Sequence, residues 1–361
     1  MHASSLVIAA AAVCLSTCNA SCSTNQKDNL TVAMVRCPPP NWPLPILNFD
    51  WTGITFNMSQ TVDRGIDLMN QAAASGADVV MFPELWFPGF PKGADGDWSM
   101  DFLPNYLENS FIVGDENWNR LMDGVVSAGV YAQINFAERK DDYLYMAQAL
   151  VSPIGDILVH RHKLRPSGTE RALFTDGTVG EIVAINTSFG RVGLLECGEH
   201  QYPSMTFILQ AQRENWHLAP FPYMLDANNT EAAWWEGAFA NMGTMGHYAN
   251  LAGAYSFTAA VGVAFVVTPL SELDGYMSHL VDFDEQPIFY HSINTSSFDS
   301  SVTYDADSQT SWGVLQQILA GFPSYIPRDE GDFTKWHSIN VTEELSGTYN
   351  MSAAGAAGPG S

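Results

Sequence analysis

The sequence predicts an α/β fold in which helices and strands form layers. A strand, a helix and a second strand follow one another between residues 30 and 82, an order typical of layered α/β cores. No low-complexity linker or internal repeat interrupts the chain between residue 30 and about residue 284. With 361 residues, 46% of them hydrophobic, the chain is long enough to bury a sizeable core. We place one domain at residues 30–345.

The first three elements follow from the periodicity of apolar residues. Residues 30–36 (LTVAMVR) alternate as a strand does, and residues 77–82 (ADVVMF) are typical of a short buried strand. Between them, apolar side chains recur at helical spacing over residues 60–75, and Gly76 follows as a stop signal.

The same signals predict the later elements, with a hairpin turn at Phe189-Gly190. The expected strands are 130–136, 144–151, 156–163, 182–185, 192–196, 217–221 and 264–268. The expected helices are 117–128, 201–214 and the greater part of 231–261. Beyond residue 268, residues 283–294 can supply strands and residues 312–320 a helix.

The first 20 residues read as a secretory signal. Their apolar core, residues 6–15, is too short to span a bilayer, and small residues precede an expected cut after Ala20. Cleavage leaves a short N-terminal segment at residues 21–29 and three cysteines, Cys22, Cys37 and Cys197. A bridge between Cys22 and Cys37 would leave Cys197 free, although spacing alone does not fix the pairing.

Glycosylation motifs and charge indicate the compartment and exclude some partners. The Asn-x-Ser/Thr sites are Asn29, Asn57, Asn186, Asn228, Asn294, Asn340 and Asn350. Together with the signal they predict a secreted, extracellular glycoprotein. The formal net charge of −24 argues against nucleic acid and against an anionic membrane surface after the signal is removed. The Ala/Gly/Ser-rich tail, 346–361, is expected to be disordered.

Three polar side chains follow expected strands. They are the carboxylate of Glu84, the ammonium of Lys163 and the thiol of Cys197. Alone, each has an ordinary interpretation as a solvated or capping Glu, a surface Lys or a small buried Cys. Together they supply a base, a charge stabiliser and a nucleophile for attack on a carbon that bears nitrogen.

Their order and surroundings resemble a known family. Phe82-Pro83-Glu84 precedes Pro88-Gly89-Phe90-Pro91. Lys163-Leu164-Arg165-Pro166 precedes Glu170-Arg171, and Cys197-Gly198-Glu199-His200 precedes Pro203. These motifs resemble the nitrilase superfamily of carbon–nitrogen hydrolases, and within it the nitrilase and cyanide hydratase branch. The resemblance is strongest over residues 30–268.

The resemblance implies a four-layer α-β-β-α sandwich with the site at the strand ends. It implies that Glu84 is the general base, Lys163 stabilises the intermediate and Cys197 is the nucleophile. Glu170 matches the family's second glutamate, and the N–H of Gly198 would be a further oxyanion donor. The substrate would be a small-molecule nitrile or amide. No metal or organic cofactor is implied, and a homo-oligomer is compatible with the resemblance.

The implied reaction adds the thiolate to a nitrile carbon and passes through a thioimidate and a thioester to a carboxylic acid and ammonia. Expulsion of the thiol from the tetrahedral species would instead release an amide. Two alternatives remain: an amidase of the same superfamily that uses the same four residues, and a catalytically silent relative that serves as a binding or structural protein.

The chain departs from the branch at three places. Gly198 stands where the branch usually has Trp, which predicts room for a bulkier nitrile. Glu196 is unusual beside the nucleophile: alternation points its side chain to the opposite face, whereas on the same face it would raise the thiol pKa. After Thr268 the branch's C-terminal motifs are missing.

Trp86 and the pair Trp234-Trp235 are candidates either for a pocket wall or for the core.

Overall fold

The structure is a computed structural model, and it describes residues 27–43, 50–91, 96–226, 233–298, 312–326 and 336–346. The expected signal, Cys22, Asn228, Asn350 and nearly all of the expected tail lie outside these residues. Within them, no helix has the length and apolar character needed to cross a membrane.

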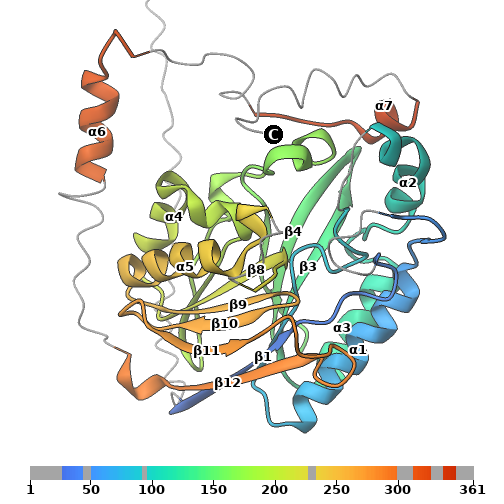
Figure 1. The fold of residues 1–361 in the computed structure, drawn as a ribbon, viewed down its shortest axis with the longest axis horizontal. Coiled ribbons are helices and arrows are strands. Elements are labelled where there is room, and N and C mark those ends of the chain that lie inside the picture. The colour runs from blue at the N-terminus through green and yellow to red at the C-terminus, as the bar shows by residue number, and fades with distance from the viewer. Residues whose placement is uncertain are drawn as a thin grey trace, which may run out of the picture.

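Two six-stranded mixed sheets form the centre of the molecule (Figure 1). In order across the first sheet, its strands are β12 (Ile288–Asn294), β1 (Asn29–Val35), β2 (Val79–Met81), β3 (Tyr131–Lys140), β4 (Tyr143–Val151) and β5 (Ile157–His162). Those of the second sheet are β11 (Leu273–Met277), β10 (Ala264–Val267), β9 (Tyr255–Val261), β8 (Trp216–Tyr223), β7 (Gly190–Leu194) and β6 (Ile185–Thr187).

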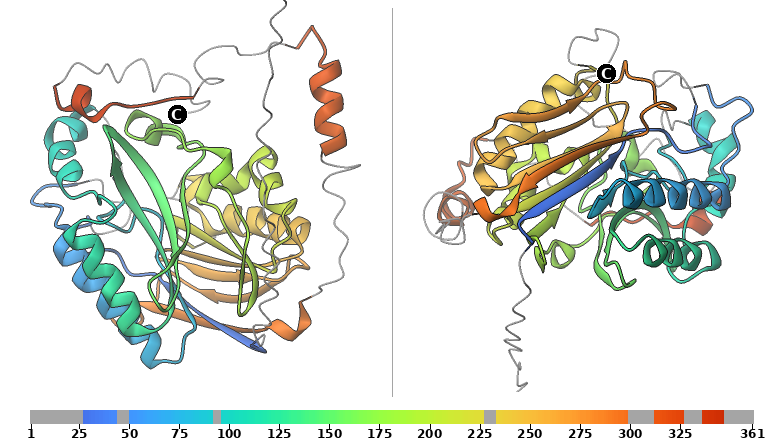
Figure 2. Two further views of the ribbon diagram at one scale, coloured as in Figure 1. Left: turned by 180° about the vertical axis from the view of Figure 1, so that it is seen from behind. Right: turned by 90° about the horizontal axis from the view of Figure 1, so that it is seen from below.

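Helices cover the outer face of each sheet. The first sheet packs against α1 (Met58–Ala74) and α3 (Glu116–Ala128), and the second packs against α4 (Pro203–Gln210) and α5 (Ala238–Ala252). The right-hand view of Figure 2 shows α1 and α3 on one side of the sheets and α5 on the other. The expected four-layer α-β-β-α sandwich is therefore confirmed.

The other helices and the 3₁₀ turns lie outside these four main helices. They are α2 (Gly96–Glu108), α6 (Trp312–Gly321), α7 (Val341–Leu345) and the 3₁₀ turns η1 (Gly168–Ala172), η2 (Val179–Glu181), η3 (Cys197–Gln201), η4 (Trp234–Glu236) and η5 (Thr295–Ser297).

Strand alternation explains the layers. In β7, Leu194 packs with apolar residues of the other sheet, whereas the next residue, Leu195, packs under α4 and α5. In β3, Ile134 and Phe136 likewise pack under α1 and α3. Each sheet thus has two buried faces, which accounts for long apolar runs in the sequence.

Parallel pairing determines where the site lies. β1, β2 and β3 pair in parallel in the first sheet, as do β7, β8 and β9 in the second. The carboxyl ends of parallel strands share one edge of a sheet, and ligand sites form there. Glu84 follows β2 and Cys197 follows β7, so the sandwich presents both at strand ends.

The expected helix over 231–261 is wrong in its second half. It ends at Ala252, where Gly253 adopts a left-handed conformation with φ of 67°. Residues 255–261 then form β9, parallel to β8. This segment is apolar on both faces, so periodicity alone does not distinguish a buried strand from a buried helix.

Other boundaries also differ from the expectations. The expected helix 201–214 is shorter, since it forms only as α4 after the η3 turn. Of the expected strand 182–185, only Ile185 belongs to a strand. The strand β11 and the helices α2 and α7 were not expected. The remaining expected strands and helices form near their expected places.

The described glycosylation candidates lie at the surface or near it. Asn29, Asn186 and Asn294 are exposed, and Asn57 and Asn340 are partly exposed at helix N-caps. Their glycosylation stays a prediction. Cys37 is a buried free thiol among the described residues, and Cys22 lies outside them, so the pairing of these two cysteines stays open.

Candidate active site

Glu84 lies just past the carboxyl end of β2. Its backbone N–H donates to the carbonyl of Phe221 in β8 at 3.1 Å, so a strand of the other sheet fixes its position. The side chain is only 1% exposed. Its Oε1 accepts a hydrogen bond from Lys163, whereas its Oε2 has no hydrogen-bond partner among the described residues. One carboxylate oxygen therefore remains available to take a proton.

Lys163 joins two carboxylates. It follows β5, is fully buried, and its Nζ donates to Glu84 Oε1 and to Glu170 Oε2, each at 2.7 Å. Glu170 lies in η1, where its Oε2 also accepts from the backbone N–H of Ser167 at 2.6 Å. The ammonium is thus held in one place by two charge-assisted hydrogen bonds.

Burial and neighbouring charges together set the protonation of these groups. Burial raises the pKa of the Glu84 carboxyl well above its ordinary value, against the opposing charge of Lys163. Burial acts to lower the pKa of Lys163, but Glu170 and Glu84 outweigh it and hold that pKa well above its ordinary value. The site therefore keeps an ammonium group.

The thiol of Cys197 needs a base. Burial, and then the charge of Glu84, raises its pKa well above the ordinary value. Lys163 and a hydrogen bond from the N–H of Gly198 act in the opposite direction. In the resting site the sulfur therefore carries its proton, and attack requires that a neighbouring group remove it.

The turn that carries Cys197 is fixed from one side by a buried ion pair. Cys197 begins η3 with a φ of 35°, in the left-handed region. Arg161 donates two hydrogen bonds to Glu199, of 2.9 and 2.6 Å. The Glu199 carboxylate also accepts from the backbone N–H groups of Glu196 and Leu164, at 2.7 and 2.8 Å. It therefore ties the turn to the end of β5.

A buried chain of side chains holds the turn from the other side. Nδ1 of His200 donates to the Cys197 carbonyl at 2.9 Å, so its Nε2 must accept from Nε2 of His217, 2.8 Å away. His217 Nδ1 lies 2.9 Å from Glu214, which also accepts from the hydroxyl of Tyr248. Burial lowers the pKa of His200 well below its ordinary value, which agrees with a neutral ring.

A cavity of about 450 Å³ opens beside Cys197 and Glu170. Its aromatic lining residues are Phe90, Tyr202, Tyr223, Trp234 and Trp235. Trp234 and Trp235 are 71% and 41% exposed, so for this pair the pocket interpretation is right. Trp86 is a core residue, because it is 1% exposed and its indole N–H donates to the Cys37 carbonyl at 2.9 Å.

Gly198 lies in the wall of this cavity. A Cβ at this position would stand 2.6 Å from Ser167 Oγ, closer than two such atoms can approach. A side chain here therefore requires that Ser167 rotate or shift. The glycine leaves open the part of the cavity that a larger residue would fill.

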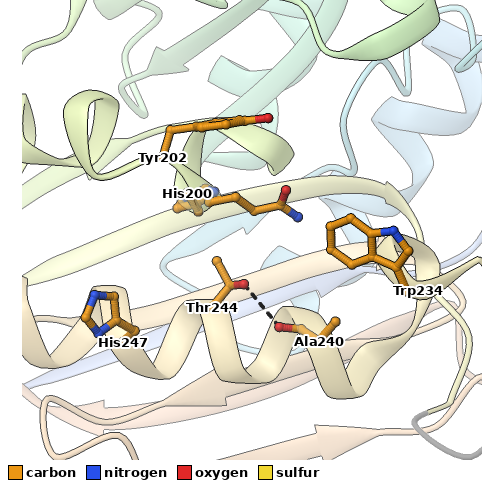
Figure 3. Close-up of a pocket in the computed structure, with 7 residues that line it drawn as sticks. His200, Tyr202, Trp234, Ala240, Thr244 and His247 are labelled. Atoms are coloured by element: carbon orange, nitrogen blue, oxygen red, sulfur yellow. Dashed lines mark hydrogen bonds between the residues drawn. The ribbon is translucent and has the colours of Figure 1, made fainter. Parts of the chain in front are cut away.

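A second hollow of about 430 Å³ adjoins the first and shares Gln201, Tyr202 and Trp234 with it. Figure 3 shows Tyr202 on one side of this hollow, Thr244 and His247 of α5 on the other, and Trp234 at one end. Trp234 and Tyr202 thus contact both spaces.

One group in the described part of the chain has donor atoms close enough to hold a metal ion. It comprises Glu138, His160 and His162, whose atoms lie within 4.8 Å of one another. These atoms already bond one another: Glu138 Oε2 lies 2.6 Å from His160 Nε2 and 2.9 Å from His162 Nε2. The group stands apart from Cys197, on the face of β5 that is turned toward Phe136 and the helices.

The structure brings the residues suggested by the sequence together. Glu84, Lys163 and Glu170 are directly hydrogen-bonded, and Glu170, Cys197 and Gly198 line one cavity. Their catalytic roles stay predictions. Sequence reasoning did not identify Arg161, Tyr202, Phe90 or Tyr223. Phe90 and Arg161 carried a signal, because Phe90 lies inside Pro88-Gly89-Phe90-Pro91 and Arg161 begins the Arg-His-Lys-Leu-x-Pro pattern that contains Lys163.

Comparisons with known proteins identify what the chain is similar to. The family model "Carbon-nitrogen hydrolase" matches residues 31–272. An aliphatic nitrilase from Rhodococcus rhodochrous is 32% identical over 175 residues, 47% of this chain and 46% of the relative. A cyanide hydratase from Leptosphaeria maculans is 30% identical over 188 residues, 50% of this chain and 53% of the relative. The chain thus spans about half the length of these curated relatives.

Among solved structures, an amidase from Nesterenkonia sp. has a similar fold. Its TM-score is 0.57 at 15% identity, and the match covers 80% of this chain and 95% of the amidase. At this identity the likeness is one of fold.

Proposed function

Because the chain belongs to the carbon–nitrogen hydrolase family, in its nitrilase and cyanide hydratase branch, we propose that it hydrolyses a nitrile to a carboxylic acid and ammonia. The observation that carries the proposal is the bridging ammonium of Lys163. It is bonded to Glu84 and to Glu170, and Glu170 lines the cavity that Cys197 also lines.

The first half of the reaction forms a thioimidate. Glu84 takes the thiol proton on its unpartnered Oε2, and the sulfur of Cys197 adds to the nitrile carbon. One π bond of the nitrile breaks, and the nitrogen receives the proton from Glu84. Lys163 and the N–H of Gly198 stabilise the negative charge that develops on the nitrogen.

The second half consumes two water molecules. As the first water adds to the thioimidate carbon, the C=N π bond breaks and Glu84 passes a proton from the water to the nitrogen. The C–N single bond of this tetrahedral species then breaks as the C=O bond forms, and Glu84 moves the hydroxyl proton to the nitrogen, which leaves as ammonia. A second water attacks the resulting thioester, and the C–S bond breaks to give the acid and the free thiol. If the C–S bond breaks before the C–N bond, an amide is the product.

The cavity supports an aromatic substrate. Five aromatic side chains line it, and the glycine at position 198 leaves its wall open next to the sulfur. Aromatic rings pack favourably against one another when they are stacked or edge-on. We therefore propose an aryl or arylalkyl nitrile. Secretion and glycosylation are likewise proposals, supported by the sequence of residues 1–20 and by the exposed asparagines.

The central test measures ammonia release from matched nitriles and amides by the purified protein and its Cys197→Ala variant. We expect release from nitriles, and loss of at least about 10³-fold in the variant because no nucleophile remains. Release from amides alone would favour an amidase. No release from either class would favour a binding protein, and activity that survives in Cys197→Ala would exclude this thiol.

The substrate class has its own test. Gly198→Trp should lower kcat/KM for an aryl nitrile about tenfold or more relative to a small nitrile, because the added ring fills the cavity beside the sulfur. Trp235→Ala should lower the same ratio by removing an aromatic wall. A ratio that stays constant in both variants contradicts the aromatic assignment while leaving nitrile hydrolysis intact.

A further inference from the structure

A fourth carboxylate, that of Glu196, is buried beside the site, and the proposed reaction does not use it. Glu196 directly precedes Cys197 and is fully buried. Within the described residues, neither of its carboxylate oxygens has a hydrogen-bond partner. Buried carboxylates ordinarily have donors, so this side chain requires an explanation.

The charged groups around Glu196 come from four parts of the chain. Lys163 and Arg161 belong to the end of β5, Glu199 to η3, Glu170 to η1, and Glu84 to the end of β2. Neither cation forms a hydrogen bond with it. Lys163 already bonds two other carboxylates, and the two terminal guanidinium nitrogens of Arg161 bond Glu199. The Nε of Arg161 also has no partner among the described residues, so it does not bond Glu196 either.

These surroundings favour the neutral form of Glu196. A carboxylate with no donor is costly to bury in its ionised form. Burial raises the pKa of Glu196 to about 7; the charges of Lys163 and Arg161 oppose the rise, and those of Glu199 and Glu170 add to it. Its proton is therefore gained and lost near neutral pH.

We propose that Glu196 is a positioning residue that acts on the reaction through Glu84 and Lys163, keeping the site active while it holds its proton and weakening it when ionised. The inference rests on the proposed chemistry of Cys197. It also accounts for an acid directly before the nucleophile, on the side that faces the other sheet.

The charges explain why ionisation of Glu196 should slow the reaction rather than speed it. The charge of an ionised Glu196 raises the pKa of Glu84, so that the base holds its proton more tightly. It also offsets the positive charge of Lys163, which the intermediate needs, and an added negative charge disfavours a thiolate on Cys197. All three effects slow attack. Since Glu84 and Glu196 interact, their titration belongs to the pair rather than to either residue.

The test is the pH profile of ammonia release by the wild-type protein and Glu196→Gln. We expect the wild-type rate to fall as the pH rises through about 7, as Glu196 loses its proton. In Glu196→Gln this fall should move up by about one pH unit or vanish, which corresponds to about a tenfold gain relative to wild type on the alkaline side. Identical profiles would overturn the proposal.

Three matched variants keep the test decisive. Glu196→Leu also removes the charge and should behave as Glu196→Gln does, even if one of the two folds poorly. Glu196→Asp keeps an acid and should keep the alkaline fall. Glu138→Gln removes a buried carboxylate elsewhere and should retain the wild-type profile. An alkaline fall that stays at the wild-type pH in both charge-removing variants excludes Glu196 as its source.

Alkylation of Cys197 by iodoacetamide separates this inference from nitrile hydrolysis. The rate is measured against pH, with Cys197→Ala supplying the background from other thiols. We expect Glu196→Gln to be alkylated at lower pH than wild type, because a nearby negative charge has been removed. This shift would support the electrostatic role even if no nitrile is turned over. Its absence, together with unchanged profiles, would refute that role.

Discussion

The end of β5 contributes to two buried charge clusters, one on each side of the strand. The histidine cluster, Glu138, His160 and His162, lies on the side of α1 and α3. The active-site cluster, Lys163 with Glu84, Glu170 and Glu196, lies at the strand ends near Cys197. Alternation along the strand separates them, because successive side chains point to opposite faces.

The clusters differ in how fully their polar atoms are bonded. Two histidine rings bond Glu138, and although burial opposes it, these hydrogen bonds lower its pKa to about 2. Glu84 and Glu196 instead keep oxygens without partners in the described structure, and burial raises their pKa values. The first arrangement stabilises ionised groups. The second keeps groups ready to exchange protons, which is what a reaction requires.

A pair of isosteric variants gives the largest expected effect and tests whether the two clusters have different roles. Glu84→Gln should lower nitrile hydrolysis about 10²–10⁴-fold, since the base is lost. Glu138→Gln should leave the rate within about twofold but destabilise the fold by about 1–3 kcal/mol, because histidine donors lose a charged acceptor. Ammonia release and denaturant unfolding measure the two effects. If Glu138→Gln lowered activity as much as Glu84→Gln, the distinction between the clusters would fail.

The pH dependence of the free energy of unfolding gives a second, smaller test of the comparison. The pKa of Glu138 is lower in the fold than in the unfolded chain, so its contribution is present above its ordinary pKa of 4.5 and is lost as the pH falls toward about 2. Despite burial, Glu138 and Glu181 raise the pKa of His162, so its contribution is lost as the pH rises through that raised value. The difference in free energy of unfolding between wild type and Glu138→Gln should therefore be largest near pH 5–6 and should decrease at lower and higher pH. Chemical denaturation at several pH values measures it. A difference independent of pH would contradict the assigned ion pairs.

Much of the fold could be predicted, because apolar periodicity is a local signal. The strand–helix–strand opening formed as expected, and most boundaries shifted by only a few residues. The strand at 255–261 was missed, since both of its faces are buried and only its pairing with β8 distinguishes it from a helix. Pairing depends on distant residues, which a local pattern does not contain.

The candidate site was partly predictable for a different reason. Glu84, Lys163, Glu170 and Cys197 lie in motifs whose order resembles a family, so their assembly could be expected. The lack of hydrogen-bond donors to Glu196 could not be predicted from the sequence, because it depends on how the nearby cations are placed and which carboxylates they already bond. The placement of Trp234 and Trp235 likewise required the cavity itself, since aromatic pairs in sequence occur equally in cores.

The pairing of β1 with β12 bears on how the protein is made. Asn29 to Val35 align with Asn294 to Ile288, so the first strand obtains one of its two neighbours from the far end of the domain. During synthesis, β1 leaves the ribosome early and waits with one edge uncovered until β12 arrives. An uncovered strand edge invites pairing with other chains. A chain stopped before Ile288 would keep that edge of β1 open, so β12 is the strand that protects it from pairing with other chains.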